Sequence, residues 1–179
     1  TQQATVSSQS MTSQNPLAIS LYTLAYDNEG KLTTTSNSLK SNLKQYLSQF
    51  MIVTDAVDIR DAFVVNIGLK FEIVTLPNVS ARDVLLKCTN ELKSYFDISR
   101  WSINQPINLS PLYTMLDKVK GVQTVKNITV ENRAGGNYSQ YAYDVKGATK
   151  DNVVYPSFDP CCFEVKYPDI DIEGRVTTL

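Results

Sequence analysis

The chain has 179 residues, enough for one medium domain or two small ones with a sizeable core. Its 17 basic and 18 acidic residues give a net charge of −1, which argues against broad electrostatic binding of nucleic acid. The absence of histidine excludes Ser-His-Asp and Cys-His catalysis. No apolar run approaches the roughly 18 residues of a membrane span. From this and from the near-zero net charge, we expect neither a membrane nor nucleic acid as a partner.

The first 16 residues are rich in Gln, Ser and Thr and contain few apolar residues. This composition predicts a flexible linker over residues 1–16. Since the chain does not begin with methionine, we expect a C-terminal fragment of a longer polypeptide. Removal of an initiator methionine or of a tag is the alternative.

Residues 17–60 are expected to form a subdomain of one strand and one helix. Apolar alternation predicts a strand over residues 17–26, followed by a turn at 27–30. A helix is predicted over residues 36–51, because apolar residues recur there at helical spacing. Such a stripe is typical of a core, and packing against a partner chain is the alternative. The stripe comprises Leu39, Leu43, Tyr46, Leu47, Phe50 and Met51.

Three aspartates follow at a spacing of three residues, Asp55, Asp58 and Asp61. On a helical turn they would share a face, which suggests a metal or acid–base site. Capping of a turn by Thr54 and Asp55, with Arg60 neutralising its neighbours, is the favoured interpretation.

Residues 61–133 are expected to form an α/β module that begins with a long strand. From 63 to 75 the odd positions are almost all apolar, which predicts a strand with one buried, apolar face. A glycine inside such a strand predicts a bend or bulge at Gly68. Ser80 and Asp83 resemble a capping box and predict the start of a helix. The apolar face of that helix comprises Leu85, Cys88, Leu92, Tyr95 and Phe96.

A second helix of this module is predicted to begin at Ser110 and Pro111 and to stop at Gly121. A strand is then predicted over residues 122–131. Its apolar residues change from one face to the other midway, which predicts a phase shift in the alternation. Arg133 to Gly136 reads as a hairpin turn into another strand, because strand rather than helix follows the glycines.

Residues 134–179 are expected to form a β-rich region that packs on the module. In an extended segment, Asp169, Asp171 and Glu173 would share one face. A cation site is conceivable there, and a solvated sheet edge is favoured. The predicted fold class is therefore α+β, with mixed or antiparallel sheets, about three helices and a split β-α-β-α-β module before the β-rich region.

The sequence contains no constellation that indicates catalysis or a bound cofactor. It has no P-loop, no dinucleotide-binding fingerprint and no zinc spacing, and its three cysteines are too few for a disulfide framework. Cys88 is expected to be buried and inert, and the adjacent Cys161 and Cys162 to point to opposite faces of a strand. We expect that the protein is not an enzyme and that it binds neither a cofactor nor a metal ion. A histidine-free glycosidase would need paired carboxylates, and no spacing singles them out.

Aromatic residues gather in the C-terminal region between prolines and glycines. Tyrosine offers a large contact area with little entropy loss, so a subset is expected to contact a partner, and stacking on sugars is the rival use. The candidate interface residues are Tyr138, Tyr141, Tyr143, Phe158 and Tyr167.

Six segments carry a resemblance to a known family. They are TDAVDIRDAFVVNIG (54–68), INQPI (103–107), DKVKGVQTV (117–125), GGNYSQYAYDVKGAT (135–149), VVYPSFDP (153–160) and FEVKYPD (163–169). With them, residues 39–176 resemble the C-terminal part of the baseplate wedge subunit of T-even-type contractile-tailed phages, in the baseplate J-like superfamily. The Cys161–Cys162 pair is not typical of that pattern.

The resemblance implies a structural subunit of the tail baseplate in the virion, made in the host cytoplasm. Such a subunit associates with itself as a dimer or ring, joins neighbouring wedge proteins, and has no catalytic residues to carry over. The alternative is a receptor- or saccharide-binding module that uses the C-terminal aromatic residues.

Overall fold

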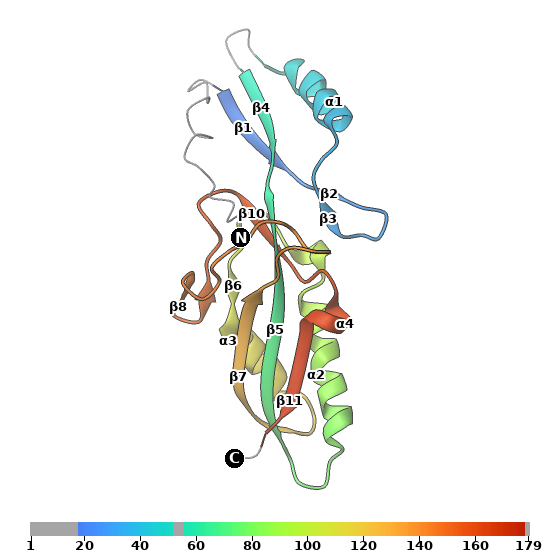
Figure 1. The fold of residues 1–179 in the computed structure, drawn as a ribbon, viewed down its shortest axis with the longest axis vertical. Helices are drawn as coiled ribbons and strands as arrows, with labels where there is room; N and C mark the ends of the chain where they lie inside the picture. Colours follow the sequence, from blue (N-terminus) through green and yellow to red (C-terminus); the bar gives the residue numbers. More distant parts are fainter. Residues whose placement is uncertain (1–17, 52–55, 178–179) are drawn as a thin grey trace. The chain divides into compact units, whose positions relative to one another are not determined.

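The computed structural model describes residues 18–51 and 56–177, so the predicted linker 1–16 lies outside the described residues. Helices and mixed sheets make the fold α+β, which confirms the predicted class (Figure 1). The chain forms two compact units, and each is described by itself. The predicted boundaries at 17–60, 61–133 and 134–179 stay predictions.

The smaller unit comprises the described residues of Thr1–Ala25 and Thr34–Asp61. In it β1 (Ala18–Thr23) pairs in parallel with β4 (Ala56–Asp61), and α1 (Asn37–Ser48) connects them. The predicted helix is confirmed, because the side chain of Ser36 accepts a hydrogen bond from the Leu39 N–H as N-cap. The predicted strand 17–26 is interrupted after β1 and resumes as β2 (Ala25–Tyr26).

The larger unit comprises the described residues of Tyr26–Thr33 and Ala62–Leu179. Its central strand is β5 (Phe63–Thr75). On one edge β7 (Val122–Asn132) pairs antiparallel, with two register shifts that confirm the predicted phase shift. On the other edge β10 (Cys161–Glu164) and β11 (Ile172–Val176) pair in parallel with successive parts of β5.

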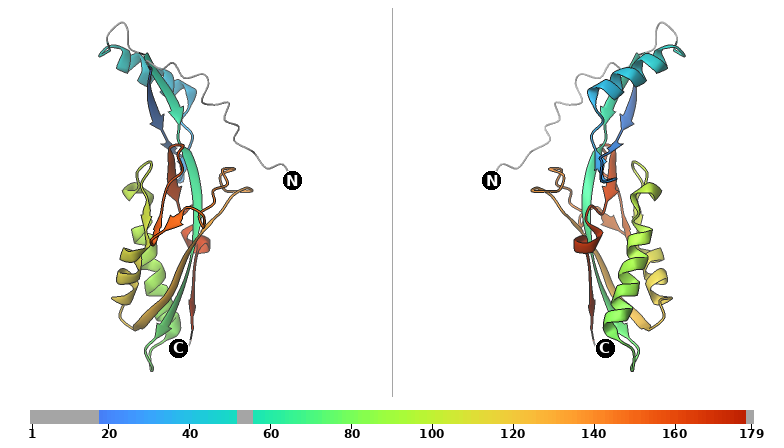
Figure 2. Two further views of the ribbon diagram at one scale, coloured as in Figure 1. Left: turned by 90° about the vertical axis from the view of Figure 1, so that its left-hand side faces the viewer. Right: turned by 90° about the vertical axis from the view of Figure 1, so that its right-hand side faces the viewer.

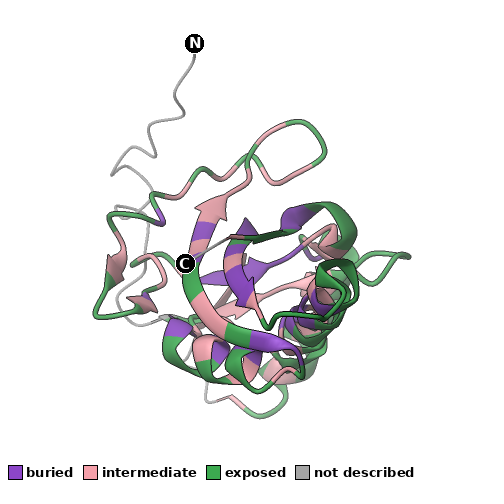
Figure 3. Cartoon of the chain, turned by 90° about the horizontal axis from the view of Figure 1, so that it is seen from below, coloured by how far each residue is buried: buried purple, intermediate pink, exposed green. Residues whose placement is uncertain are grey.

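Two helices cover one face of this sheet. In the side views, α2 (Ala81–Tyr95) and α3 (Leu109–Asp117) lie on the same side of β5 (Figure 2). The odd positions of β5 from Val65 to Ile73 are buried, as the alternation predicted. Cys88 and Leu92 of α2 are also fully buried, and Figure 3 shows buried positions gathered between sheet and helices.

Short elements complete the larger unit. β3 (Leu32–Thr33) pairs with β2 around the predicted turn, where Gly30 has a φ of +76°. The β6 (Ile107–Asn108), β9 (Val153–Val154) and β8 (Thr149–Lys150) strands form a small antiparallel sheet. The 3₁₀ turn η2 (Ile98–Arg100) and the helix α4 (Pro168–Asp171) lie in connecting segments.

The second helix differs from its prediction at both ends. α3 begins at Leu109 with Asn108 as N-cap, because the Asn108 side chain accepts a hydrogen bond from the Ser110 N–H. It ends at Asp117, before Gly121, whose φ of +107° belongs to the following turn. A Cβ at Gly121 would meet the side chain of Val84, so close packing also requires glycine there.

The predicted strand after residues 133–136 is wrong, since residues 133–148 form an irregular loop. Side-chain amides bind the backbone N–H groups that a neighbouring strand would otherwise bind. Asn66 Oδ1 accepts from the Ser139 N–H at 2.7 Å, and Asn132 Oδ1 accepts from the Tyr143 N–H at 3.1 Å. Positive φ angles at Gly135 and Gly136 turn the chain away from an extended path.

Candidate interaction surface

The apolar stripe of α1 is the first candidate surface, because none of the described residues of this helix is buried. Leu39, Tyr46 and Phe50 are 53%, 58% and 71% exposed. With 3.6 residues per turn, Leu39 and Tyr46 lie within about 20° of one another around the helix axis. Phe50 lies in the turn after the helix, with its ring centroid 5.2 Å from that of Tyr46. The core interpretation of the stripe is therefore wrong for this flank, and packing against a partner chain stays a prediction.

An adjacent flank of α1 is fixed to the smaller unit by polar contacts. Lys40 Nζ forms an ion pair with Asp61 Oδ2 at 2.5 Å, and Asp61 Oδ1 accepts a hydrogen bond from the Thr35 N–H at 2.9 Å. Leu47 lies next to Lys40 around the helix axis, Leu43 lies between Lys40 and Leu39, and both leucines are half-buried. These contacts orient the helix so that Leu39, Tyr46 and Phe50 face solvent.

The aspartates near this helix form no shared site among the described residues. Asp58 and Asp61 lie on β4, an extended strand, and not on a helical turn. Arg60 pairs with Asp58 at 2.5 Å, which confirms the predicted neutralisation. Asp61 is held by Lys40, while Thr54 and Asp55 lie outside the described residues.

Two of the five predicted interface residues contact each other. The rings of Tyr138 and Tyr167 meet edge to face with centroids 5.5 Å apart, and Lys31 lies over the Tyr167 ring at 4.1 Å. The Tyr138 hydroxyl donates to Asp171 Oδ1 at 2.7 Å, and this hydrogen bond to a carboxylate raises the pKa of Tyr138 to about 12. Both side chains therefore have partners within the chain.

The other three predicted residues differ in exposure. Tyr141 stacks on Phe63 with ring centroids 4.4 Å apart, and the Tyr143 hydroxyl donates to the Tyr155 carbonyl at 2.7 Å. Phe158 is fully exposed. Of the five, Phe158 is the one whose ring is open to solvent on all sides, and the four tyrosines are half-buried.

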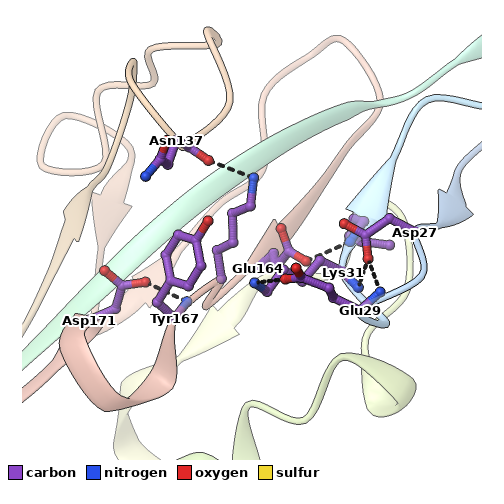
Figure 4. A network of polar contacts seen from close by, with 9 residues as sticks. Asp27, Glu29, Lys31, Asn137, Glu164, Tyr167 and Asp171 are labelled. Atoms are coloured by element: carbon purple, nitrogen blue, oxygen red, sulfur yellow. Dashed lines mark hydrogen bonds and ion pairs between the residues drawn. The ribbon is translucent and has the colours of Figure 1, made fainter.

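Sequence reasoning missed a buried polar network in the larger unit. Glu164 is 3% exposed, and its two carboxylate oxygens accept from the Leu32 N–H and from Asn66 Nδ2, both at 2.7 Å. Burial raises the pKa of Glu164, and the two hydrogen bonds oppose this shift. Figure 4 shows Glu164 beside the β2–β3 turn, where Asp27 Oδ1 accepts from the Glu29 and Lys31 N–H groups.

Asp171 is a second buried carboxylate, and it corrects the prediction of a shared acidic face. Residues 168–171 form α4, so Asp171 is buried, Asp169 pairs with Lys93, and Glu173 pairs with Arg133. Asp171 Oδ2 accepts from the Tyr167 N–H at 2.8 Å (Figure 4). In the part of the chain that the structure describes, no group of three acidic or cysteine side chains is arranged to hold a metal ion.

Gly68 lies next to these groups. Of the predicted bend or bulge there, the bulge is wrong, because β5 and β7 keep their register at Gly68, and the bend stays a prediction. A Cβ at Gly68 would lie 2.7 Å from Arg133 Nε and 3.2 Å from the Asp171 carbonyl oxygen. Gly68 also falls between the part of β5 that pairs with β10 and the part that pairs with β11. Glycine is therefore required by the close approach of Arg133 and α4 to the sheet.

The three cysteines are buried and unpaired, as predicted for Cys88. Burial raises the pKa of the Cys88 thiol to about 11 and that of Cys162 to about 12. A thiol with so high a pKa carries little thiolate at neutral pH and is a poor nucleophile.

Comparison with known proteins gives no match, either to a protein-family model or to a curated protein sequence. Across residues 18–51 and 56–177, no helix has the length and apolar character that a membrane crossing requires.

Proposed function

We propose that the chain is a structural subunit of a phage tail baseplate wedge, where it associates with itself and with neighbouring wedge proteins. The six sequence segments that resemble the baseplate family support this proposal. The exposed flank of α1 is the structural observation that carries it. A subunit built for permanent assembly needs apolar surface that only a partner covers.

The energy available at this surface fits a protein contact. Burying an exposed Leu or Phe side chain contributes about 1.5–3 kcal/mol. Tyr46 and Phe50 lie with ring centroids 5.2 Å apart, so one partner surface can cover both rings. Tyrosine is enriched among the residues that dominate binding energy at interfaces.

No enzymatic activity or cofactor is part of the proposal, and the partners are other copies of this chain and other wedge proteins. The raised pKa values of Cys88 and Cys162 fit a structural role for these buried side chains.

The test is immunogold electron microscopy of tailed virions from the source phage, with antibody raised against this chain. Label at the baseplate is the expected result. Label on the fibres would favour the receptor-binding alternative and refute the wedge assignment, as would the absence of label on both intact and disrupted particles.

A double substitution tests whether the exposed flank of α1 makes the proposed contact. We expect Tyr46→Ser with Phe50→Ser to reduce incorporation into baseplates at least tenfold, because two aromatic contacts are lost. Gln45→Ser, an exposed polar position on the same helix, is the matched control and should assemble normally. Equal incorporation of both variants would show that this flank contacts no wedge protein.

A further inference from the structure

The loop between β9 and β10 presents Phe158 as a fully exposed aromatic side chain. Pro156 and Pro160 flank it and restrict the backbone on both sides. Within the loop the Ser157 hydroxyl donates to the Asp159 carbonyl at 2.5 Å. The exposed ring is thus part of a conformationally restricted loop.

Both ends of this loop are bound to the body of the larger unit. At one end the Tyr155 carbonyl accepts from the Tyr143 hydroxyl at 2.7 Å, and the Tyr155 N–H donates to the Ala148 carbonyl at 3.1 Å. At the other end the Pro160 carbonyl accepts from the Phe63 N–H at 2.8 Å. A preorganised loop loses little entropy on binding, which favours its use as a contact element.

A groove of about 900 Å³ lies between α2 and α3 on the same unit. Its apolar lining includes Pro111, Met115 and Val119, of which Met115 and Val119 are half-buried. The volume is within the range of roughly 300–1,000 Å³ that is typical of ligand sites, and ample for one aromatic side chain.

The charges around the groove are predominantly positive. Lys87, Lys118 and Lys120 line it, and Glu91 is the acidic residue in the lining. Within the described residues, none of these three lysines forms an ion pair. The Phe158 loop offers the complementary pair, an aromatic ring followed at once by the exposed carboxylate of Asp159.

We propose that the Phe158 loop of one copy inserts into the α2–α3 groove of a second copy, with Asp159 facing the lysines. The inference rests on the self-association in the proposed function and names the surfaces that make it. Because loop and groove are different surfaces, the contact is heterologous. Such contacts extend beyond a dimer, into a ring when the rotation closes or into a chain when it does not.

The test is sedimentation equilibrium of the full chain over a range of concentrations. Phe158→Ala is expected to raise the dissociation constant at least about 30-fold, because a fully buried aromatic contact is lost. Ile170→Ala is the matched control, since Ile170 is also an exposed apolar residue outside the proposed contact. Both variants should keep the unfolding midpoint of the parent chain, because both side chains are exposed.

Charge reversal tests the lysine contact. Asp159→Lys should weaken association, and combining it with Lys118→Glu and Lys120→Glu should restore part of the loss. In a second experiment, Asp159→Cys with Lys118→Cys, treated with dissolved oxygen and a copper catalyst as oxidant, should form disulfide-linked species larger than a dimer. The three native cysteines are buried and should not compete.

Association that persists unchanged in Phe158→Ala would overturn this inference, as would a chain that stays monomeric at every concentration. These results differ from a failure of the proposed function. Baseplate label together with association that does not depend on Phe158 would leave the wedge assignment intact and reject the loop–groove contact alone.

Discussion

Replacing Asn66 with alanine is expected to destabilise the larger unit by about 3–5 kcal/mol. Asn66 is 1% exposed, and its amide connects the loop 133–148 to the buried carboxylate of Glu164. Its Oδ1 accepts from the Ser139 N–H and its Nδ2 donates to Glu164 Oε2, both at 2.7 Å. The variant removes the partner of the half-buried Ser139 N–H and of a buried carboxylate oxygen of Glu164. Each loss costs about 1–3 kcal/mol, with the charged group at the upper end.

Urea unfolding followed by the fluorescence of Trp101 measures this effect, since Trp101 belongs to the larger unit and is the chain's one tryptophan. Asn127→Ala is the matched control. Its amide donates to the Thr129 hydroxyl at 3.2 Å in an exposed position, so the expected change is within about 0.5 kcal/mol. A difference between the two variants below about 1 kcal/mol would refute the structural role of the buried amide.

The remaining predictions concern Glu164 and Gly174. The folded-state pKa of Glu164 is raised above its usual value of 4.5, so its contribution to stability is present below that value and is lost as pH rises through the folded pKa. The unfolding free energy of the parent minus that of Glu164→Gln should therefore fall as pH rises from about 4 to 8, and a pH-independent difference would contradict the burial argument. Gly174→Ala should cost about 1–3 kcal/mol in urea unfolding, because its Cβ would overlap the buried ring of Phe71. An unchanged midpoint would show that Phe71 can move.

The local pattern of the sequence determined those elements in which apolar residues recur at a regular spacing. The buried face of residues 63–75 and the capped helix after Ser80 both follow from the spacing of residue types over a few positions. Burial of Cys88 follows from the same periodicity, because a helix places residues three and four apart on one face. These features could be predicted from the sequence because neighbours in the chain determine them.

The tertiary structure decided which apolar face is covered and which polar residues are buried. The stripe of α1 has the spacing of a core helix, yet Leu39 and Tyr46 are exposed, while Lys40 on the adjacent flank pairs with Asp61. The expected strand after Gly136 is a loop because Asn66, 73 residues before Ser139, binds its backbone. Contacts between residues so far apart leave no periodic signal in the sequence. Only the folded chain brings them together, and there the cost of burying an unpaired polar group determines the partners.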